Sequence, residues 1–256
     1  MPMILAIDIG NTHIEIGLYQ DRQYRGSWRI ATGVHRTEDE LMAFLQHFLN
    51  LASVERSAIH DIAISSVVPN VTQIFLRLCD KYFHTQPLVV THTLDLGITV
   101  AYQPPENVGA DRLCNAVAAV EKYGAPCIVV DFGTATTLDV VSADRVYLGG
   151  VIAPGLETAA GGLHERASKL PRISLEFPPS AIGRSTEESI QSGIMLGTVK
   201  MIDGLIEEIQ QELGRKAHII ATGGLSQLLA PRSKFIEHVE PHLVLDGLVE
   251  VYYRQR

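Results

Sequence analysis

Residues suited to phosphate chemistry gather first in the stretch ILAIDIGNTHIEIGLY (4–19). An aliphatic run leads to Asp8, and Gly10 and Asn11 then bend the chain. Glycine lets a backbone approach phosphate closely, and turn N–H groups can donate to its oxygens together with Asn11 and Thr12. A carboxylate such as Asp8 can hold the Mg²⁺ that accompanies a nucleotide. An ordinary β-hairpin with a Gly-Asn turn would have the same residues, so this stretch alone fits both a phosphate site and a plain hairpin.

The same order of residues occurs a second time. CIVVDFGTATTLDVV (127–141) is again an aliphatic strand, followed by Asp131, a Gly133-Thr134 turn and a second strand. Two copies indicate two related halves, and each half would contribute an acidic turn to a shared cleft. Clefts between domains are preferred sites for small molecules.

A third acidic residue stands at the predicted start of a helix. ENVGADRLCNAVAAV (106–120) predicts a helix from about Ala110, with Asp111 and Arg112 in its first turn. The helix dipole alone favours an aspartate at this position, so Asp111 could be an ordinary helix-start residue. A cation there costs a few tenths of a kcal/mol, roughly, so Arg112 indicates an anionic partner.

Charge and cysteine content limit the class of protein. The 256 residues carry a net charge of −8, which argues against a partner such as nucleic acid or an anionic membrane. The three cysteines, Cys79, Cys114 and Cys127, show no CxxC spacing, as expected in a reducing compartment. There is neither a signal-peptide pattern nor an apolar run of the roughly 20 residues that span a bilayer. We therefore expect a cytoplasmic protein without a membrane partner.

The elements that must position these residues follow from hydrophobic spacing. In the first half, the pattern predicts a hairpin at 4–19, strands at 23–31, 61–68 and 87–91, a helix after the capping box Thr37–Glu40, and a helix from Pro69. In the second half, it predicts the repeated hairpin, strands at 146–152, 217–221 and 242–245, and helices within 149–163, 184–213 and 247–253. The helix at 184–213 would begin with a second capping box, Ser185–Glu188, and Thr222-Gly223-Gly224 would form a turn where a nucleotide could lie.

The predicted fold class is therefore α/β, with two duplicated domains of mixed sheet and helical cover. We expect an N-terminal domain at 1–116 and a C-terminal domain at 117–256.

Several nucleotide and metal motifs are absent. No Gly-Lys pair exists for a Walker A loop, and no GxGxxG follows a strand. Asp131-Phe132-Gly133 imitates the protein-kinase DFG motif, but no HRDxxxxN precedes it. The ten histidines show no HExxH or other metal spacing. The candidates that remain for nucleotide chemistry are the two phosphate-binding turns, which lack a Walker lysine, and the aspartates Asp8, Asp111 and Asp131.

Five motifs in order carry a resemblance to a known family. DIGNT (8–12), GADR (109–112), DFGTATT (131–137), GGVIAPG (149–155) and STEESIQSG (185–193) resemble type III pantothenate kinases over nearly the whole chain. That family belongs to the acetate and sugar kinase/Hsc70/actin superfamily. The resemblance implies two ribonuclease-H-like domains with mixed five-stranded sheets, flanking helices and an ATP cleft between them.

The resemblance further implies ATP-dependent phosphorylation of pantothenate to 4′-phosphopantothenate, the first step of coenzyme A biosynthesis. Asp111 would be the general base, Asp131 would bind a monovalent cation (K⁺ or NH₄⁺), and Asp8 would be the residue nearest Mg²⁺. The implied ATP-binding residues are Asp8, Ile9, Gly10, Asn11, Thr12, His13, Ile14, Glu15 and Thr134. The implied substrate-binding residues are Tyr102, Gly109, Ala110, Asp111, Arg112 and Thr186. The resemblance leaves open whether Thr186 acts in its own site or, across the interface of a homodimer, in the site of the partner. One departure is Gly161-Gly162-Leu163, where an alanine-leucine pair is expected, and this affects packing more than chemistry.

Two other functions are compatible with parts of the pattern. Another kinase of the superfamily, acting on a sugar or acetate, would share the phosphate turns, although GADR and STEESIQSG favour pantothenate. A nucleotide-binding regulator of the same fold would have lost catalysis, and the presence of Asp8, Asp111 and Asp131 together argues against this.

Overall fold

The computed structural model describes residues 3–167 and 169–256 and separates into two compact units. Unit 1 contains the chain through Lys122 together with Leu243–Arg256, and unit 2 is Tyr123–His242. This division differs from the predicted ranges in two ways: the boundary lies six residues later than 116/117, and the C-terminal segment belongs to unit 1. Among the described residues, no helix has the length and apolar character needed to cross a bilayer.

The sheet of unit 1 is mixed. Its strands are β1 (Met3–Ile9), β2 (His13–Gln20), β3 (Gln23–Ala31), β4 (Ile59–Ser66) and β5 (Leu88–Val89), in the spatial order β3-β2-β1-β4-β5. The β1–β2 and β2–β3 pairs are antiparallel, whereas β4 lies parallel to both β1 and β5. A further short strand of unit 1, β6 (Thr99–Val100), is not part of this five-stranded sheet.

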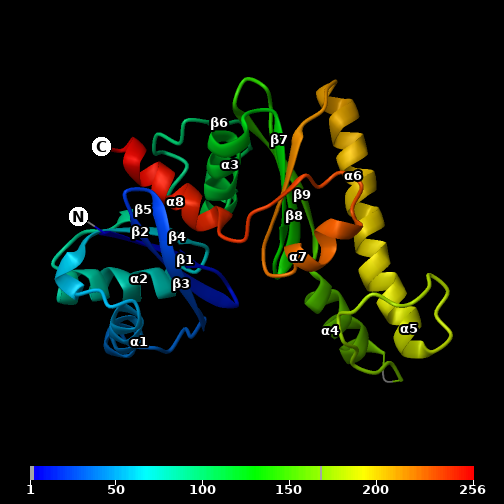
Figure 1. Ribbon diagram of the computed structural model, residues 1–256, viewed down its shortest axis with the longest axis horizontal. Helices are drawn as coiled ribbons and strands as arrows, with labels where there is room; N and C mark the ends of the chain where they lie inside the picture. Colours follow the sequence, from blue (N-terminus) through cyan, green and yellow to red (C-terminus); the bar gives the residue numbers. More distant parts are fainter. Residues whose placement is uncertain (1–2, 168) are drawn as a thin grey trace. The chain divides into compact units, whose positions relative to one another are not determined.

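Helices cover both faces of this sheet (Figure 1). They are α1 (Glu38–Leu51), α2 (Pro69–Leu78), α3 (Ala110–Tyr123) and α8 (Leu243–Arg254). Alternate residues of β1, namely Leu5, Ile7 and Ile9, are buried in one core with side chains of α1 and α2. The helix α8 contacts β1, β2 and β4. Because side chains of a strand alternate between its faces, Asp8 points away from the α1–α2 face.

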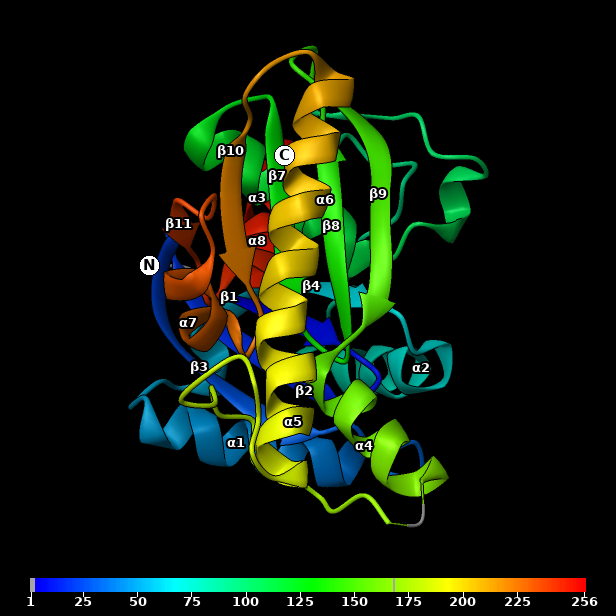
Figure 2. The same cartoon turned by 90° about the vertical axis from the view of Figure 1, so that its right-hand side faces the viewer.

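Unit 2 repeats the arrangement. Its strands are β7 (Cys127–Phe132), β8 (Ala135–Val141), β9 (Val146–Pro154), β10 (His218–Thr222) and β11 (His238–Val239), in the order β11-β10-β7-β8-β9. Its helices are α4 (Leu156–Arg166), α5 (Thr186–Gln191), α6 (Gly197–Leu213) and α7 (Ser226–Leu229). Figure 2 shows α6 running along one face of the sheet, and there Ile202 and Ile206 share a core with Val130 of β7.

The two sheets have the same connectivity. In each, three consecutive strands form an antiparallel meander, and a fourth and a fifth strand add in parallel beside the first. The predicted duplication of the α/β fold is therefore confirmed at the level of topology, beyond the two similar hairpins.

Helix starts match the predicted caps to different degrees. The Thr37–Glu40 capping box is complete, with the Thr37 N–H donating to Glu40 at 2.8 Å and the Glu40 N–H donating to the Thr37 hydroxyl at 3.2 Å. In the second box only one half forms, because the Glu188 carboxylate accepts from the N–H of Arg184 at 2.7 Å instead of that of Ser185. The predicted helix at 184–213 is divided into α5, a π-helical turn at Ser192–Leu196, and α6.

The predicted strand at 242–245 is wrong, because Leu243 and Leu245 belong to α8. Most residues of this helix are buried, so its apolar residues cover a wide sector of its surface instead of a narrow stripe. A short apolar run of this kind has no period that distinguishes a strand from a buried helix.

Candidate functional site

Asp8 stands at the carboxyl end of β1, opposite Ser65 of the parallel strand β4. The Ser65 hydroxyl is fully buried and donates a hydrogen bond to Asp8 Oδ1 at 2.8 Å. Ser65 was not predicted as a site residue, because its place beside Asp8 depends on the pairing of strands more than 50 residues apart. Its hydroxyl fixes one oxygen of the carboxylate.

The turn after Asp8 is braced by the end of β3. The Gly10 N–H donates to the carbonyl of His13 at 3.0 Å, and the Thr32 hydroxyl donates to the carbonyl of Gly10 at 2.7 Å. Asn11, Thr12 and His13 lie exposed at the tip of this turn. A rigid turn with exposed polar residues is suited to a phosphate ligand.

The other predicted ATP-binding residues of this hairpin point elsewhere. The side chains of Ile9 and Ile14 are fully buried in the core with α1 and α2, so only their backbone groups can meet a ligand. Glu15 is half-buried and accepts a hydrogen bond from Ser27 at 3.2 Å.

The motif GADR forms the entry to α3. Asp111 lies in the first turn, and its Oδ1 accepts a hydrogen bond from the backbone N–H of Arg112 at 2.8 Å. Burial raises the pKa of the Asp111 carboxyl above its usual value, and Arg112 partly opposes this shift. A Cβ on Gly109 would lie 2.3 Å from Asp111 Oδ1, so glycine at that position makes room for the carboxylate.

The thiol of Cys114 lies near both Asp8 and Asp111 in unit 1. Burial raises the pKa of this thiol well above its usual value, the charges of Asp8 and Asp111 raise it further, and a hydrogen bond with Ser65 opposes them. Cys114 is fully buried on α3, one turn after Asp111. The predicted base and the predicted Mg²⁺ residue therefore both lie near this thiol. Tyr102 lies half-buried in the segment of unit 1 that leads to this helix.

Unit 2 holds Asp131 in the position equivalent to Asp8. Asp131 is near the end of β7, opposite Thr222 of the parallel strand β10. A Cβ on Gly223 would lie 2.4 Å from Asp131 Oδ1, and Gly223 has a φ of 86°. The turn predicted for nucleotide contact, which begins at Thr222, thus lies beside Asp131. Carboxylate and hydroxyl oxygens are ligands suited to a hard cation.

The turn that carries Thr134 is tied to the start of α4. The Thr134 carbonyl accepts hydrogen bonds from the N–H of Gly155 at 3.1 Å and from the hydroxyl of Thr158 at 2.8 Å. A Cβ on Gly155 would lie 2.3 Å from the carbonyl oxygen of Gly133, so this close approach requires glycine. Thr186 is exposed in the first turn of α5. The cleft expected between the two halves stays a prediction.

Comparisons with known proteins agree with the motifs. Residues 4–208 match a family model described as type III pantothenate kinase. A type III pantothenate kinase from Thermomicrobium roseum is 47% identical over 252 residues, which cover 98% of this chain and 97% of that protein. A ROK hexokinase structure from Thermus thermophilus shares the fold with a TM-score of 0.56 at 12% identity, covering 99% of this chain and 100% of the other. A Campylobacter jejuni structure, of a proposed Baf family transcriptional activator, has a TM-score of 0.60 at 19% identity over 98% of both chains.

Proposed function

Since the chain belongs to the type III pantothenate kinase family, we propose that it transfers the γ-phosphoryl group of ATP to the hydroxyl of pantothenate. The product would be 4′-phosphopantothenate, which makes the reaction the first step of coenzyme A biosynthesis. The observation that carries the proposal is the half-buried Asp111 carboxylate in the first turn of α3, which lies near the same Cys114 thiol as Asp8.

Asp111 would act as the general base. Phosphoryl transfer needs the attacking hydroxyl to be oriented and its proton accepted as the new P–O bond forms. A raised pKa makes the Asp111 carboxylate a better proton acceptor than an exposed aspartate, because a catalytic base works best with a pKa near the operating pH.

Pantothenate would bind along the start of α3. Its carboxylate would meet the guanidinium of Arg112, which explains a cation in the first turn of a helix. Gly109 and Ala110 would line the same site, and Tyr102 and Thr186 are the remaining substrate positions.

ATP would bind at the two acidic turns, through residues Asp8–Glu15 and Thr134. Mg²⁺, when bound, neutralises charge on the phosphates, and the Asp8 carboxylate held by Ser65 would lie nearest to it. The N–H groups of the turn would donate to phosphate oxygens.

Asp131 would hold the monovalent cation, K⁺ or NH₄⁺. Its carboxylate lies over the backbone of Gly223 and opposite Thr222, a site whose donors are oxygens. We expect turnover to be several-fold faster in K⁺ or NH₄⁺ than in Na⁺. Equal turnover rates with all three cations would contradict this role for Asp131.

The working form would be a cytoplasmic homodimer. Leu148 and Ile152 of β9 are 48% and 63% exposed, which a second copy of the chain could cover. In the dimer, Thr186 would serve the partner's site. The three cysteines are free thiols, as expected in a reducing compartment. Light scattering that gives the mass of one chain at assay concentration would contradict the dimer.

The experiment that tests the function is ADP release from ATP and Mg²⁺ with different acceptors. We expect release with pantothenate and not with acetate, glucose or no acceptor, and a product with the mass of phosphopantothenate. Release with acetate or a sugar would identify a different kinase of the superfamily. A chain that binds ATP and transfers to none of them would support the alternative, a nucleotide-binding regulator. The Campylobacter jejuni likeness does not favour that alternative, because at 19% identity it concerns the fold alone.

A further inference from the structure

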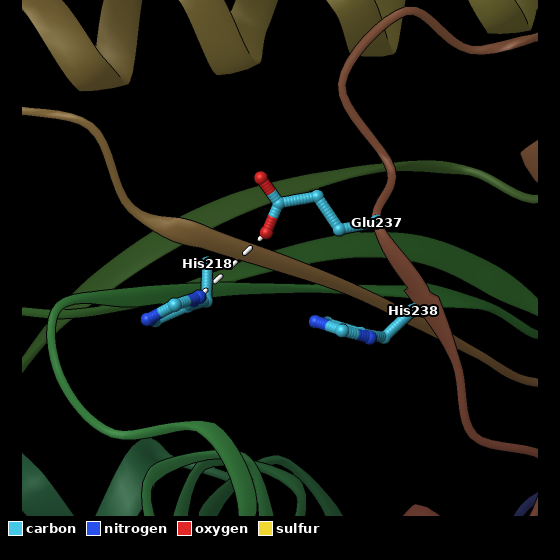
Figure 3. Close-up of side chains that lie close together, drawn as sticks. All are labelled: His218, Glu237 and His238. Atoms are coloured by element: carbon cyan, nitrogen blue, oxygen red, sulfur yellow. Dashed lines mark ion pairs between the residues drawn. The ribbon is translucent and has the colours of Figure 1, made fainter.

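Two histidines and a glutamate converge on one edge of the sheet in unit 2. They are His218 at the start of β10, His238 in β11, and Glu237 just before it. Each offers one ligand atom, and these three atoms lie within 4.8 Å of one another. Figure 3 shows the two imidazole rings side by side and the Glu237 carboxylate reaching toward His218. Histidines so far apart in sequence show no motif spacing, so only the pairing of the strands reveals the cluster.

This cluster is separate from the residues proposed for phosphoryl transfer in unit 2. His218 pairs with Cys127 at the start of β7, whereas Asp131 pairs with Thr222 at the other end of β10. His218 and Thr222 are four residue steps apart along β10, which corresponds to about 13 Å at 3.3 Å per residue. The cluster therefore has its own environment.

The backbone around the cluster is fixed by hydrogen bonds. The His218 N–H donates to the carbonyl of Pro126 at 3.0 Å, and the Glu237 N–H donates to the carbonyl of Ile219 at 3.0 Å. The N–H of Glu240 donates to the carbonyl of Ala221 at 2.8 Å. These hydrogen bonds fix the backbone that carries the three side chains, so less conformational entropy is lost when an ion binds to them.

The ring of His238 is held in place. It stacks on Tyr123, with ring centroids 4.0 Å apart and an angle of 18° between the planes, and the Tyr123 hydroxyl donates to Glu240. The stacked tyrosine therefore fixes the orientation of the His238 ring.

The spacing of the donor atoms suits a small ion. His218 Nδ1 and Glu237 Oε2 are 3.6 Å apart, longer than a good hydrogen bond. Two ligand atoms of tetrahedral Zn²⁺ are about 3.3 Å apart, given bonds of about 2.0–2.1 Å. Small side-chain rotations would therefore bring all three atoms to bonding distance.

We propose that His218, Glu237 and His238 form a Zn²⁺ site with a water as the fourth ligand. Imidazole nitrogen favours borderline ions such as Zn²⁺, whereas Mg²⁺ favours an all-oxygen shell, so the Mg²⁺ of the kinase reaction does not compete. The bound ion links the short edge strand β11 to β10 and stabilises unit 2, because a ligand that binds only the folded state raises its stability.

The test uses the full-length chain without a histidine tag, freed of metal by a chelator. Zn²⁺ binding is measured by calorimetry in excess Mg²⁺, and Co²⁺ is added separately to report coordination through its visible absorption. The variants are His218→Gln and His238→Gln, and the control is His47→Gln, which removes an exposed histidine of α1 in unit 1. Circular dichroism establishes that each variant is folded.

We expect one Zn²⁺ per chain for the parent and for His47→Gln, with a tetrahedral Co²⁺ spectrum and a Tm that rises with Zn²⁺. Affinity should fall at least about tenfold in both other variants, since even loss of an outer-shell partner costs about 10–100-fold. Absence of Zn²⁺ binding in the parent would overturn the proposal and leave a plain His218–Glu237 ion pair. Equal binding in all four proteins would also overturn it, because other histidines would then hold the metal.

Discussion

Small neighbours hold the two carboxylates of unit 1 in place. Ser65 donates a hydrogen bond to Asp8, and Gly109 leaves the space into which the Asp111 carboxylate folds. The Cys114 thiol lies near both carboxylates and shares a hydrogen bond with the Ser65 hydroxyl. Catalysis by positioning depends on such contacts, because small misplacement of a reacting group is costly.

Replacing Ser65 by alanine should lower kcat by about tenfold while the protein remains folded. Loss of one hydrogen bond to a charged group costs about 1.5–3 kcal/mol. Part of this loss would lower kcat, because the Asp8 carboxylate would be less well oriented. The matched control is Thr72→Ala, which removes a half-buried hydroxyl that donates a hydrogen bond to Ser66 Oγ at 2.7 Å. Steady-state kinetics and thermal unfolding separate the two effects. Equal kinetic losses in both variants would show that Ser65 serves only the fold.

Replacing Arg112 by alanine should raise the KM for pantothenate at least tenfold and change kcat much less. The guanidinium would bind the substrate carboxylate equally in the ground and transition states, and loss of such uniform binding appears in KM. Arg112→Lys should recover part of the loss, because a charge remains without the two-pronged geometry. An unchanged KM in Arg112→Ala would remove this residue from the substrate site.

The sequence predicts some of these residues better than others. Asp8, Asp131 and Asp111 stand in local motifs, so the residues next to them in the sequence indicate their chemistry. Ser65 could not be found in this way, since its proximity to Asp8 results from strand pairing. Cys114 follows Asp111 by one helical turn, but its proximity to Asp8 results from the packing of α3 in the folded unit.

Among the elements, the turn between β7 and β8 depends on its contact with α4. Gly155 N–H bonds to the Thr134 carbonyl, and the backbones approach closely enough to exclude a side chain. The motif GGVIAPG therefore has a structural reason for its last glycine.

Gly155→Ala should lower the free energy of unfolding by about 1–3 kcal/mol, the usual cost of overpacking. The control is Gly161→Ala in the middle of α4, where a Cβ would meet nothing within 4 Å. That change should stabilise the helix by up to about 1 kcal/mol. Urea unfolding measures both. The same sign for both variants would contradict the close contact at Gly155.

The elements themselves were predictable where local signals are strong. The strand Gln23–Ala31 and the helix after Thr37 follow from alternation and a complete capping box. The π-helical turn at Ser192–Leu196 and the helical state of Leu243–Leu245 were not, because both depend on burial against other elements.

At the scale of the whole molecule, one topology is used twice. The repeated acidic hairpins predicted this, and the shared strand order shows that the likeness extends to the fourth and fifth strands. The return of α8 to unit 1 has no sequence signal, since its apolar residues could have covered either sheet.

The three thiols should be unreactive in the folded chain. Burial raises the pKa of Cys79 and of Cys127 to about 12 and holds that of Cys114 well above its usual value, so little reactive thiolate exists at pH 8. A thiol reagent should label almost none of them in the native protein and all three in denaturant.

The same shifts have a consequence for stability. Between the usual thiol pKa of 9.0 and about 12, the unfolded chain ionises its cysteines while the folded chain does not. The thiols therefore favour folding below pH 9, and their contribution is lost as the pH rises through this range. Rapid labelling of Cys79 or Cys127 at pH 8 in the native state would contradict the burial on which both expectations rest.

Turnover of Asp111→Asn with ATP, Mg²⁺, K⁺ and pantothenate tests the proposed chemistry most directly. We predict a fall in kcat of about 10² to 10⁴, the usual contribution of a general base, with unchanged unfolding. Asp80→Asn, an exposed change in the same unit, should keep the parent rate. Near-parental turnover by folded Asp111→Asn would contradict the account.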